Sequence, residues 1–409
     1  MSSENKKIRV VIGLSGGVDS SVAAHILCEQ GYEVIGLFMR NWHDTTGTLE
    51  GDCPWYDDQI FAELVAKRLD IPFHYIDLSE QYRKRVVDYM FNEYANGRTP
   101  NPDVLCNREI KFDAFLDAAI ELGADYVATG HYCRRSVEEV DGKNYYRLLS
   151  GLDKNKDQSY FLCQLNQKML SRALFPIGEL QKSEVREIAA AQKLATATRK
   201  DSQGICFVGK VDLPTFLQQK LTPKKGNIVE IPDNLEVYAD YDLLSTQITD
   251  TPSSEFLENL STPFKYTQKM GKVIGEHRGA HYFTIGQRKG LNIGGHKEPL
   301  FIIATDVETN TIYVGESDRH HGLYHSCLHI NQHELHWVSQ DHSLKVGESM
   351  RLQFRIRYRQ PLQQGTLYIR EKGAYIIFDE PQRGITPGQF ASWYDMNGDE
   401  LIGSGVIQY

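Results

Sequence analysis

The chain has 409 residues, of which 41% are hydrophobic and 24% are charged, and its formal net charge is −9. This length allows two or three domains with real hydrophobic cores, and the composition is typical of a soluble globular protein. The acidic balance excludes a surface that binds RNA everywhere, so any RNA site has to be a local basic patch.

The cysteines and the start of the chain indicate the compartment. The seven cysteines lie at positions 28, 53, 106, 133, 163, 206 and 327. They are odd in number and form no Cys-x-x-Cys pair, which favours a reducing compartment and argues against a structural metal. The polar residues 1–7 contain no signal-peptide core, and no apolar run is long enough to span a bilayer. We therefore expect a cytoplasmic protein without membrane contact.

A glycine-rich turn is the first feature that points to chemistry. It follows a predicted strand at 8–12 and precedes a predicted helix that ends at Gly31. The turn consists of Gly13, Leu14, Ser15, Gly16, Gly17, Val18, Asp19 and Ser20. Unpaired N–H groups at a helix start and the positive end of the helix dipole suit a phosphate group. Asp19 is placed to hold Mg²⁺ or to polarise a neighbouring group, and the alternative is a plain strand–helix turn.

The turn lacks the Gly-Lys-Ser/Thr ending of a Walker A loop, which disfavours transfer of a γ-phosphate. Its Ser-Gly-Gly-x-Asp-Ser pattern resembles the pyrophosphatase loop of ATP-dependent adenylating enzymes. In those enzymes ATP is cut between its α- and β-phosphates, and a substrate oxygen becomes adenylated. The resemblance therefore implies ATP, with Mg²⁺, as the cofactor.

Predicted strands at 33–39, 73–76 and 125–129 alternate with helices, which predicts a doubly wound parallel sheet. The carboxyl ends of such strands bind ligands. Met39 lies at one of these ends and either covers an adenine or belongs to the core. Gly130 follows another strand, where close approach to a nucleotide is plausible, and His131 after it is either functional or structural.

Two cysteines lie in chemically suggestive surroundings. Two prolines keep 99–103 extended, and Asn107 is expected to cap the next helix. Cys106 would then lie beside a helix N-terminus, with a thiol pKa that falls further because of Arg108 and Lys111. A buried, inert cysteine is the alternative.

The second cysteine, Cys206, lies in a turn with a glycine and nearby cations. A polar and then aromatic stretch at 155–161 precedes it, and is either a solvated turn or a loop that contacts RNA.

The pattern changes at about residue 211. We expect an ATP-binding catalytic domain at 1–210, a central domain at 211–298 and a C-terminal β-barrel at 299–409. Residues 227–264 contain no Lys or Arg and eight acidic residues, so we interpret 232–268 as an acidic inserted loop.

A row of arginines marks one predicted barrel strand. Apolar Leu352, Phe354, Ile356 and Tyr358 alternate with Arg351, Arg355, Arg357 and Arg359. One face would be core, and the other would present guanidinium groups to an RNA backbone or simply to water.

Together these motifs resemble those of bacterial-type tRNA-specific 2-thiouridylases over nearly the whole chain. The motifs are the glycine-rich turn, Asn101-Pro102-Asp103 with Cys106, 129–132, 156–158, 204–206, 286–290, 357–359 and 386–389. The resemblance implies a sheet of the adenine nucleotide alpha hydrolase type and a C-terminal barrel that binds tRNA. It also implies ATP-dependent 2-thiolation of a wobble uridine, through an adenylated uridine and a cysteine persulfide. Only the acidic segment at 232–268 departs from the pattern.

The resemblance also implies roles for individual residues. Gly13 to Ser20, Met39 and Gly130 would bind ATP, and Asn101, Pro102 and Asp103 would meet the target base. Cys206 would receive a persulfide and Cys106 would be the second nucleophile, with Asp103 as a general acid or base. The residues expected to contact tRNA are His131, Lys156, Asp157, Gln158, Arg357, Tyr358 and Gln389. The implied partners are a tRNA with a wobble uridine and a protein sulfur donor, either a persulfide carrier or a cysteine desulfurase relay.

Three other functions compete with this hypothesis. An amidotransferase-type or argininosuccinate-type synthetase would share the loop but needs no cysteine pair. A 4-thiouridine synthetase would carry different RNA-binding appendages. A tRNA-binding or nucleotide-sensing protein without catalysis would bind tRNA tightly and release no AMP.

Overall fold

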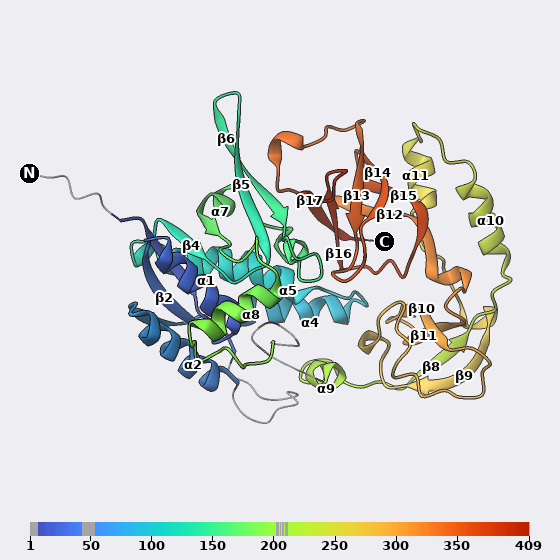
Figure 1. The fold of residues 1–409 in the computed structure, drawn as a ribbon. Coiled ribbons are helices and arrows are strands. Elements are labelled where there is room, and N and C mark those ends of the chain that lie inside the picture. The colour runs from blue at the N-terminus through green and yellow to red at the C-terminus, as the bar shows by residue number, and fades with distance from the viewer. Residues whose placement is uncertain are drawn as a thin grey trace, which may run out of the picture.

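The computed structural model describes residues 7–42, 54–201, 204, 206, 208 and 212–408, so Cys53 lies outside the described residues. Figure 1 shows a parallel sheet with helices at the N-terminal end, a small central sheet, and a C-terminal sheet that closes into a barrel. This architecture confirms the fold class that the sequence predicts. None of the helices in the described part of the chain has the length and apolar character needed to cross a bilayer.

The N-terminal sheet has five parallel strands in the order β3-β2-β1-β4-β7. Its strands are β1 (Arg9–Gly13), β2 (Glu33–Arg40), β3 (Phe73–Asp77), β4 (Tyr126–Ala128) and β7 (Ala173–Leu174). Val10 and Ile12 face one helical layer, whereas Val11 between them faces the other. Burial on both faces explains why this strand is a continuous β-branched run.

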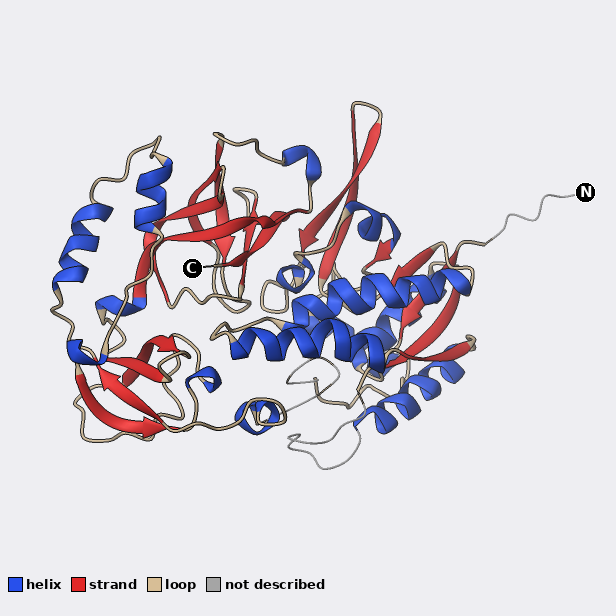
Figure 2. Ribbon diagram, turned by 180° about the vertical axis from the view of Figure 1, so that it is seen from behind, coloured by secondary structure: helices blue, strands red, loops and turns tan. Residues whose placement is uncertain are grey.

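Helices cover both faces of this sheet (Figure 2). One layer contains α1 (Val18–Glu29), α2 (Pro54–Leu69) and α8 (Lys182–Ala191). The other layer has two long helices, each with a π-helical part. The first consists of α3 (Ser79–Tyr82), η1 (Arg83–Val87) and α4 (Asp88–Ala95), and the second of α5 (Pro102–Leu105), η2 (Cys106–Ala114) and α6 (Phe115–Glu121). The short helices η3 (Ser159–Leu162) and α7 (Gln167–Arg172) follow.

The start of the second long helix differs from the prediction. Asn101 is the cap, because its side chain accepts a hydrogen bond from the N–H of Val104 at 3.3 Å. Pro102 occupies the first helical position, where its missing N–H costs nothing. The helix therefore begins five residues before Asn107, the predicted cap, and Pro102 and Asp103 are helical rather than extended. Cys106 consequently lies inside the helix and not at its N-terminus.

The barrel belongs to an eight-stranded sheet in the order β12-β15-β14-β13-β16-β17-β6-β5, closed by pairing of β12 with β17. Its C-terminal strands are β12 (Tyr324–Trp337), β13 (Ser349–Arg355), β14 (Gln363–Arg370), β15 (Gly373–Arg383), β16 (Phe390–Tyr394) and β17 (Glu400–Ile407), with η7 (Gln340–His342) between two of them. The other two strands of this sheet, β5 (Cys133–Val140) and β6 (Lys143–Ser150), form a hairpin that belongs to the N-terminal part of the chain. In Figure 1 this hairpin stands between the N-terminal domain and the barrel. Buried Arg147 on β6 forms two hydrogen bonds, of 2.6 and 2.7 Å, with Asp341. This ion pair fastens the hairpin to the barrel side.

The central sheet is larger than the sequence predicts. Its order is β10-β11-β8-β9, with β8 (Gly226–Glu230), β9 (Lys272–His277), β10 (Leu300–Asp306) and β11 (Thr311–Glu316). Sequence analysis places 299–316 in the barrel, whereas β11 pairs in parallel with β8. An apolar strand pattern does not say which sheet a strand joins, which explains the error. The short helices around this sheet are α9 (Leu213–Leu217), η4 (Gln268–Met270), η5 (Ala280–Tyr282) and η6 (His321–Leu323).

The acidic segment 232–268 is predicted to be a loop, but the structure forms two helices within it, α10 (Glu236–Ser245) and α11 (Ser254–Leu260). Both stand along the side of the barrel in Figure 1. The side chain of Ser253 caps α11 by accepting a hydrogen bond from the N–H of Phe256 at 3.1 Å. Leu257 and Leu260 then pack on barrel residues such as Tyr375. The cap at Ser253 and the two leucines are helical signals, but the acidic and polar composition of the segment favoured a loop in the prediction.

Candidate active site

The glycine-rich turn joins β1 to α1 as predicted, with Gly17 as the helix cap. Gly16 has a φ of +74°, and a Cβ at this position would lie 2.2 Å from the carbonyl oxygen of Asp58. Both the conformation and the lack of space require glycine here. The hydroxyl groups of Ser15 and Ser20 are 3.1 Å apart, and that of Ser20 accepts a hydrogen bond from the N–H of Ser15. The turn therefore has the compact form of a phosphate-binding loop.

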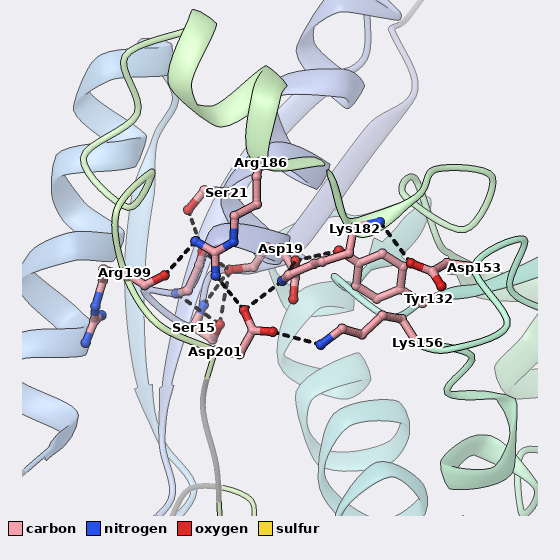
Figure 3. Close-up of polar contacts among 12 residues, drawn as sticks. Ser15, Asp19, Ser21, Tyr132, Asp153, Lys156, Lys182, Arg186, Arg199 and Asp201 are labelled. Atoms are coloured by element: carbon pink, nitrogen blue, oxygen red, sulfur yellow. Dashed lines mark hydrogen bonds and ion pairs between the residues drawn. The ribbon is translucent and has the colours of Figure 1, made fainter. Parts of the chain in front are cut away.

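Cations from distant segments surround this turn (Figure 3). Lys182, the first residue of α8, donates a hydrogen bond to Oδ1 of Asp19 at 2.6 Å. Arg199 donates to the carbonyl oxygen of Gly16 at 2.8 Å. Sequence analysis missed Lys182 as a site residue, because only the fold brings it beside a loop 163 positions earlier in the chain.

Asp201 forms ion pairs with Lys182 and with two further cations near the turn, Lys156 and Arg186. Its carboxylate lies 2.9 Å from Nζ of Lys156, 2.9 Å from Nζ of Lys182 and 2.7 Å from Arg186. Although partial burial opposes ionisation, hydrogen bonds from Lys156 and Lys182 lower the pKa of Asp201 overall. Such a group of cations around a helix N-terminus is the electrostatic requirement for a bound polyphosphate.

Gly130 and Met39 both lie beside the turn, as the sequence predicts. A Cβ on Gly130 would be 2.7 Å from the backbone nitrogen of Ser20, so this position touches the start of α1. Met39 is buried at the end of β2, in the core cluster that also contains Val11. The proposed contacts of both residues with ATP stay predictions.

The two cysteines that the sequence singles out are brought together. Sγ of Cys106 lies 3.6 Å from Sγ of Cys206, and the contact is a hydrogen bond. The backbone N–H of Cys206 donates to Oδ1 of Asp103 at 3.0 Å. The hydroxyl of Tyr82 donates to the carbonyl oxygen of Cys206 at 2.6 Å. Two thiols and a carboxyl group therefore form one centre.

The two sulfur atoms are electrostatically different. A hydrogen bond from Cys106 and the positive charge of Lys111 lower the pKa of Cys206. Burial raises the pKa of Cys106 well above its ordinary value, and the bond to Cys206 raises it further. The predicted fall in the pKa of Cys106 is therefore wrong, because Cys106 lies inside a helix and a core rather than at a helix N-terminus. Burial also raises the pKa of Asp103.

An open pocket of about 320 Å³ lies next to this centre. It is lined by Met90, Tyr94, Thr99, Pro100, Asn101, Pro102, Asp103, Leu213 and Gln389. Gln389 of the C-terminal part reaches the pocket and donates hydrogen bonds to the carbonyl oxygens of Thr99 at 2.9 Å and Pro100 at 3.1 Å. The residues predicted to meet the target base therefore share one pocket with Gln389.

Several predicted RNA-contacting residues have partners inside the protein. His131 is only 7% exposed, and its Nδ1 lies 2.7 Å from the hydroxyl of Thr129. Asp157 is also buried and accepts hydrogen bonds from the N–H groups of Gly151 and Ser159. The proposed tRNA contacts of His131 and Asp157 stay predictions, but neither side chain presents an open surface here.

Two further predicted tRNA contacts, Gln158 and Tyr358, also have neighbours within the protein. Oε1 of Gln158 accepts a hydrogen bond from the N–H of Tyr132 at 3.0 Å. The ring of Tyr358 packs against that of Phe161, with the ring centroids 4.2 Å apart and the planes tilted by 37°. Their contacts with tRNA likewise stay predictions.

The arginine row does not form the uniform surface that the alternation predicts. Strand β13 ends at Arg355, so Arg357 and Arg359 follow it in a turn. Arg351 pairs with Asp379, and Arg355 lies 3.2 Å from Asp157. Arg357 donates hydrogen bonds to the carbonyl oxygens of Ile285 and Gly384 and to the hydroxyl of Thr386. Arg357 thus joins Ile285 of the central domain to the barrel, and its predicted contact with tRNA stays a prediction.

Comparison with known proteins covers most of the chain. Family models described as "tRNA methyl transferase HUP domain", "tRNA methyl transferase PRC-barrel domain" and "Aminomethyltransferase beta-barrel domain" match residues 8–210, 256–316 and 328–407. The chain is 60% identical over 399 residues to a protein of Flavobacterium johnsoniae named tRNA-specific 2-thiouridylase MnmA, covering 98% of this chain and 99% of the relative. Relatives with the same name from Christiangramia forsetii and Shouchella clausii are 61% and 45% identical, over 98% of this chain and 99% and 96% of theirs.

Proposed function

This chain belongs to the tRNA-specific 2-thiouridylase family, and on that premise we propose that it uses ATP to thiolate C2 of the wobble uridine of a tRNA. As a member of this family it is a sulfurtransferase enzyme. The observation that carries the proposal is the 3.6 Å contact between the sulfur atoms of Cys106 and Cys206, with Asp103 beside them. An adenylating enzyme that transfers no sulfur needs no such pair.

The first stage is activation of the uridine. The C2 oxygen is a poor leaving group, and adenylation converts it into part of AMP. N–H groups of the turn, together with Lys182 and Arg199, would bind the phosphates and stabilise departing pyrophosphate.

Mg²⁺ fits the same place, because it commonly binds one or two carboxylates together with substrate phosphates. Asp19 is the carboxylate of the turn, and Lys182 and Tyr132 both donate to its Oδ1. When bound, the ion would offset phosphate charge.

The second stage is sulfur transfer. The Cys206 thiolate would take the terminal sulfur of a donor persulfide, and the resulting terminal sulfur would attack C2 while AMP leaves. This forms a disulfide between Cys206 and the uridine C2 sulfur. Cys106 would then lose its proton and attack the sulfur of Cys206, which breaks that bond, releases 2-thiouridine and leaves a Cys106–Cys206 disulfide. A dithiol reductant would restore both thiols. Asp103, whose pKa is raised by burial, is suited to carry a proton at this centre.

A single-turnover reaction with a ³⁵S-labelled persulfide donor, ATP and tRNA tests this function. Cys206→Ser should adenylate tRNA but bind no labelled sulfur. Cys106→Ser should carry label on Cys206 yet yield little 2-thiouridine. The control is Cys327→Ser, which changes a buried cysteine of the barrel and should transfer sulfur normally. Full thiouridine yield from both active-centre variants would overturn the proposal, and tRNA binding without AMP release would favour a non-catalytic protein.

A further inference from the structure

Lys111 is a cation near the cysteine centre, and its charge acts on both thiols. It lies on the π-helix η2, five residues and therefore little more than one turn after Cys106, and is half-buried. Its Nζ lies 3.5 Å from Nε2 of His131, and its positive charge acts on Cys206. We propose that Lys111 holds the Cys206 sulfur ready to accept sulfur from the donor, a role that rests on the proposed sulfur transfer.

His131 sets the position of this ammonium group. Burial and the charge of Lys111 lower the pKa of His131 well below its ordinary value, so the ring is neutral. Nδ1 donates to the hydroxyl of Thr129 at 2.7 Å in the tautomer that leaves Nε2 to accept from Lys111. The rings of Phe112 and Phe175 pack around His131. A fixed neutral imidazole therefore keeps the ammonium directed at the sulfur without competing with its charge.

The charges around Cys206 support the same role. Among the described residues, the titratable groups around Cys206 are Cys106 and Lys111 from η2, Asp103 from α5 and Tyr82 from α3. Burial alone would lower the pKa of Lys111, but its interactions with Cys206 and with the neighbouring acidic groups raise that pKa overall, so Lys111 stays cationic. The hydrogen bond from Cys106 is the largest cause of the lowered pKa of Cys206, and among these groups Lys111 supplies the positive charge.

The chemical step needs an anionic Cys206. Its thiolate attacks the terminal sulfur of a donor R–S–S–H, the S–S bond of the donor breaks, and R–S⁻ leaves. The product is Cys206–S–S–H, and no net oxidation or reduction occurs. Because a thiolate, and not a thiol, is the nucleophile, a nearby cation raises the reactive fraction at neutral pH.

The pH dependence of Cys206 alkylation tests the proposal, using the full-length chain, iodoacetamide and peptide mapping. Lys111→Met should raise the alkylation midpoint by at least about one pH unit and slow Cys206 alkylation at pH 7 about tenfold. Lys111→Arg should retain most of the wild-type rate, because it keeps the charge. The matched control is Arg108→Met, which removes a charge from the same helix; Arg108 binds Gln164 and Glu109 instead.

An unchanged midpoint in Lys111→Met would overturn the proposal, as would an equal shift in Arg108→Met. If Lys111→Met fails to fold, Lys111→Gln is the replacement, and a wild-type midpoint in that variant would have the same consequence. Alkylation requires no donor, ATP or tRNA. If the wild type takes no sulfur from glutathione persulfide, the proposed function fails. The alkylation midpoints still show whether Lys111 controls the ionisation of Cys206.

Discussion

The sulfur atoms of Cys106 and Cys206 lie 3.6 Å apart although 100 positions separate them in the chain. A disulfide needs an S–S distance of about 2.05 Å, so a shift of roughly 1.5 Å closes the bond. We expect diamide to form this disulfide before any other within the chain, and dithiothreitol to reverse it. Mass spectrometry of alkylated peptides measures the result. Either active-centre serine variant should abolish the linked peptide and Cys327→Ser should not; a linked peptide that persisted in Cys206→Ser would show that another pair had formed.

ATP should be cleaved to AMP and pyrophosphate, because the turn lacks the Walker lysine. Asp19→Ala should lower the rate at least about 100-fold, equivalent to about 3 kcal/mol of transition-state stabilisation. Lys182→Met should lower it by a similar factor, since Lys182 contacts Asp19 and Asp201 beside the turn. Lys168→Met, at an exposed position of α7, is the control. Chromatography of the nucleotides provides the measurement, and ADP as the main product would contradict the assignment.

Gly130→Ala should impair the phosphate loop even though it adds one methyl group. Its Cβ would lie 2.7 Å from the nitrogen of Ser20 and 2.8 Å from the carbonyl carbon of Asp19, so the start of α1 has to move. We expect a loss of about 1–3 kcal/mol in unfolding free energy and weaker ATP binding. Denaturant unfolding and calorimetric titration of ATP measure both. Gly294→Ala should leave them unchanged, because no atom lies within 4 Å of that Cβ; equal effects of the two variants would refute this explanation.

Arg357→Ala should act on stability more than on RNA electrostatics. Its guanidinium group satisfies the carbonyl oxygens of Ile285 and Gly384, and removing it leaves them without this donor. We expect a loss of about 1–3 kcal/mol in unfolding free energy, with little change in the salt dependence of tRNA binding. Replacing the exposed neighbour Arg359 by Ala should leave the free energy of unfolding nearly unchanged. It should instead reduce the slope of log affinity for tRNA against log salt concentration by roughly one unit per lost phosphate contact. Thermal unfolding and filter binding at several salt concentrations distinguish the two patterns.

The sequence by itself determined the features whose residues are consecutive. The turn from Gly13 to Ser20 could be recognised because a phosphate-binding loop is built from neighbouring backbone groups and from the start of the helix that follows. The strand pattern likewise indicated a doubly wound sheet and a barrel, since burial on one face leaves alternating apolar residues and burial on both faces leaves a continuous apolar run. The two helices within the polar and acidic segment 232–268 could not be predicted, because a cap such as Ser253 and two leucines are weak helical signals in such a composition.

Only the tertiary structure decided what depends on residues that meet in space. Lys182 and Arg199 contact the phosphate loop from distant positions in the chain, and no local sequence pattern predicts such a contact. The same holds for the different states of Cys106 and Cys206. Nearby cations in the sequence suggested two reactive thiols, but a pKa follows from burial and from neighbours in three dimensions. Packing inside a helix raises the pKa of Cys106, whereas the contacts with Cys106 and Lys111 lower that of Cys206.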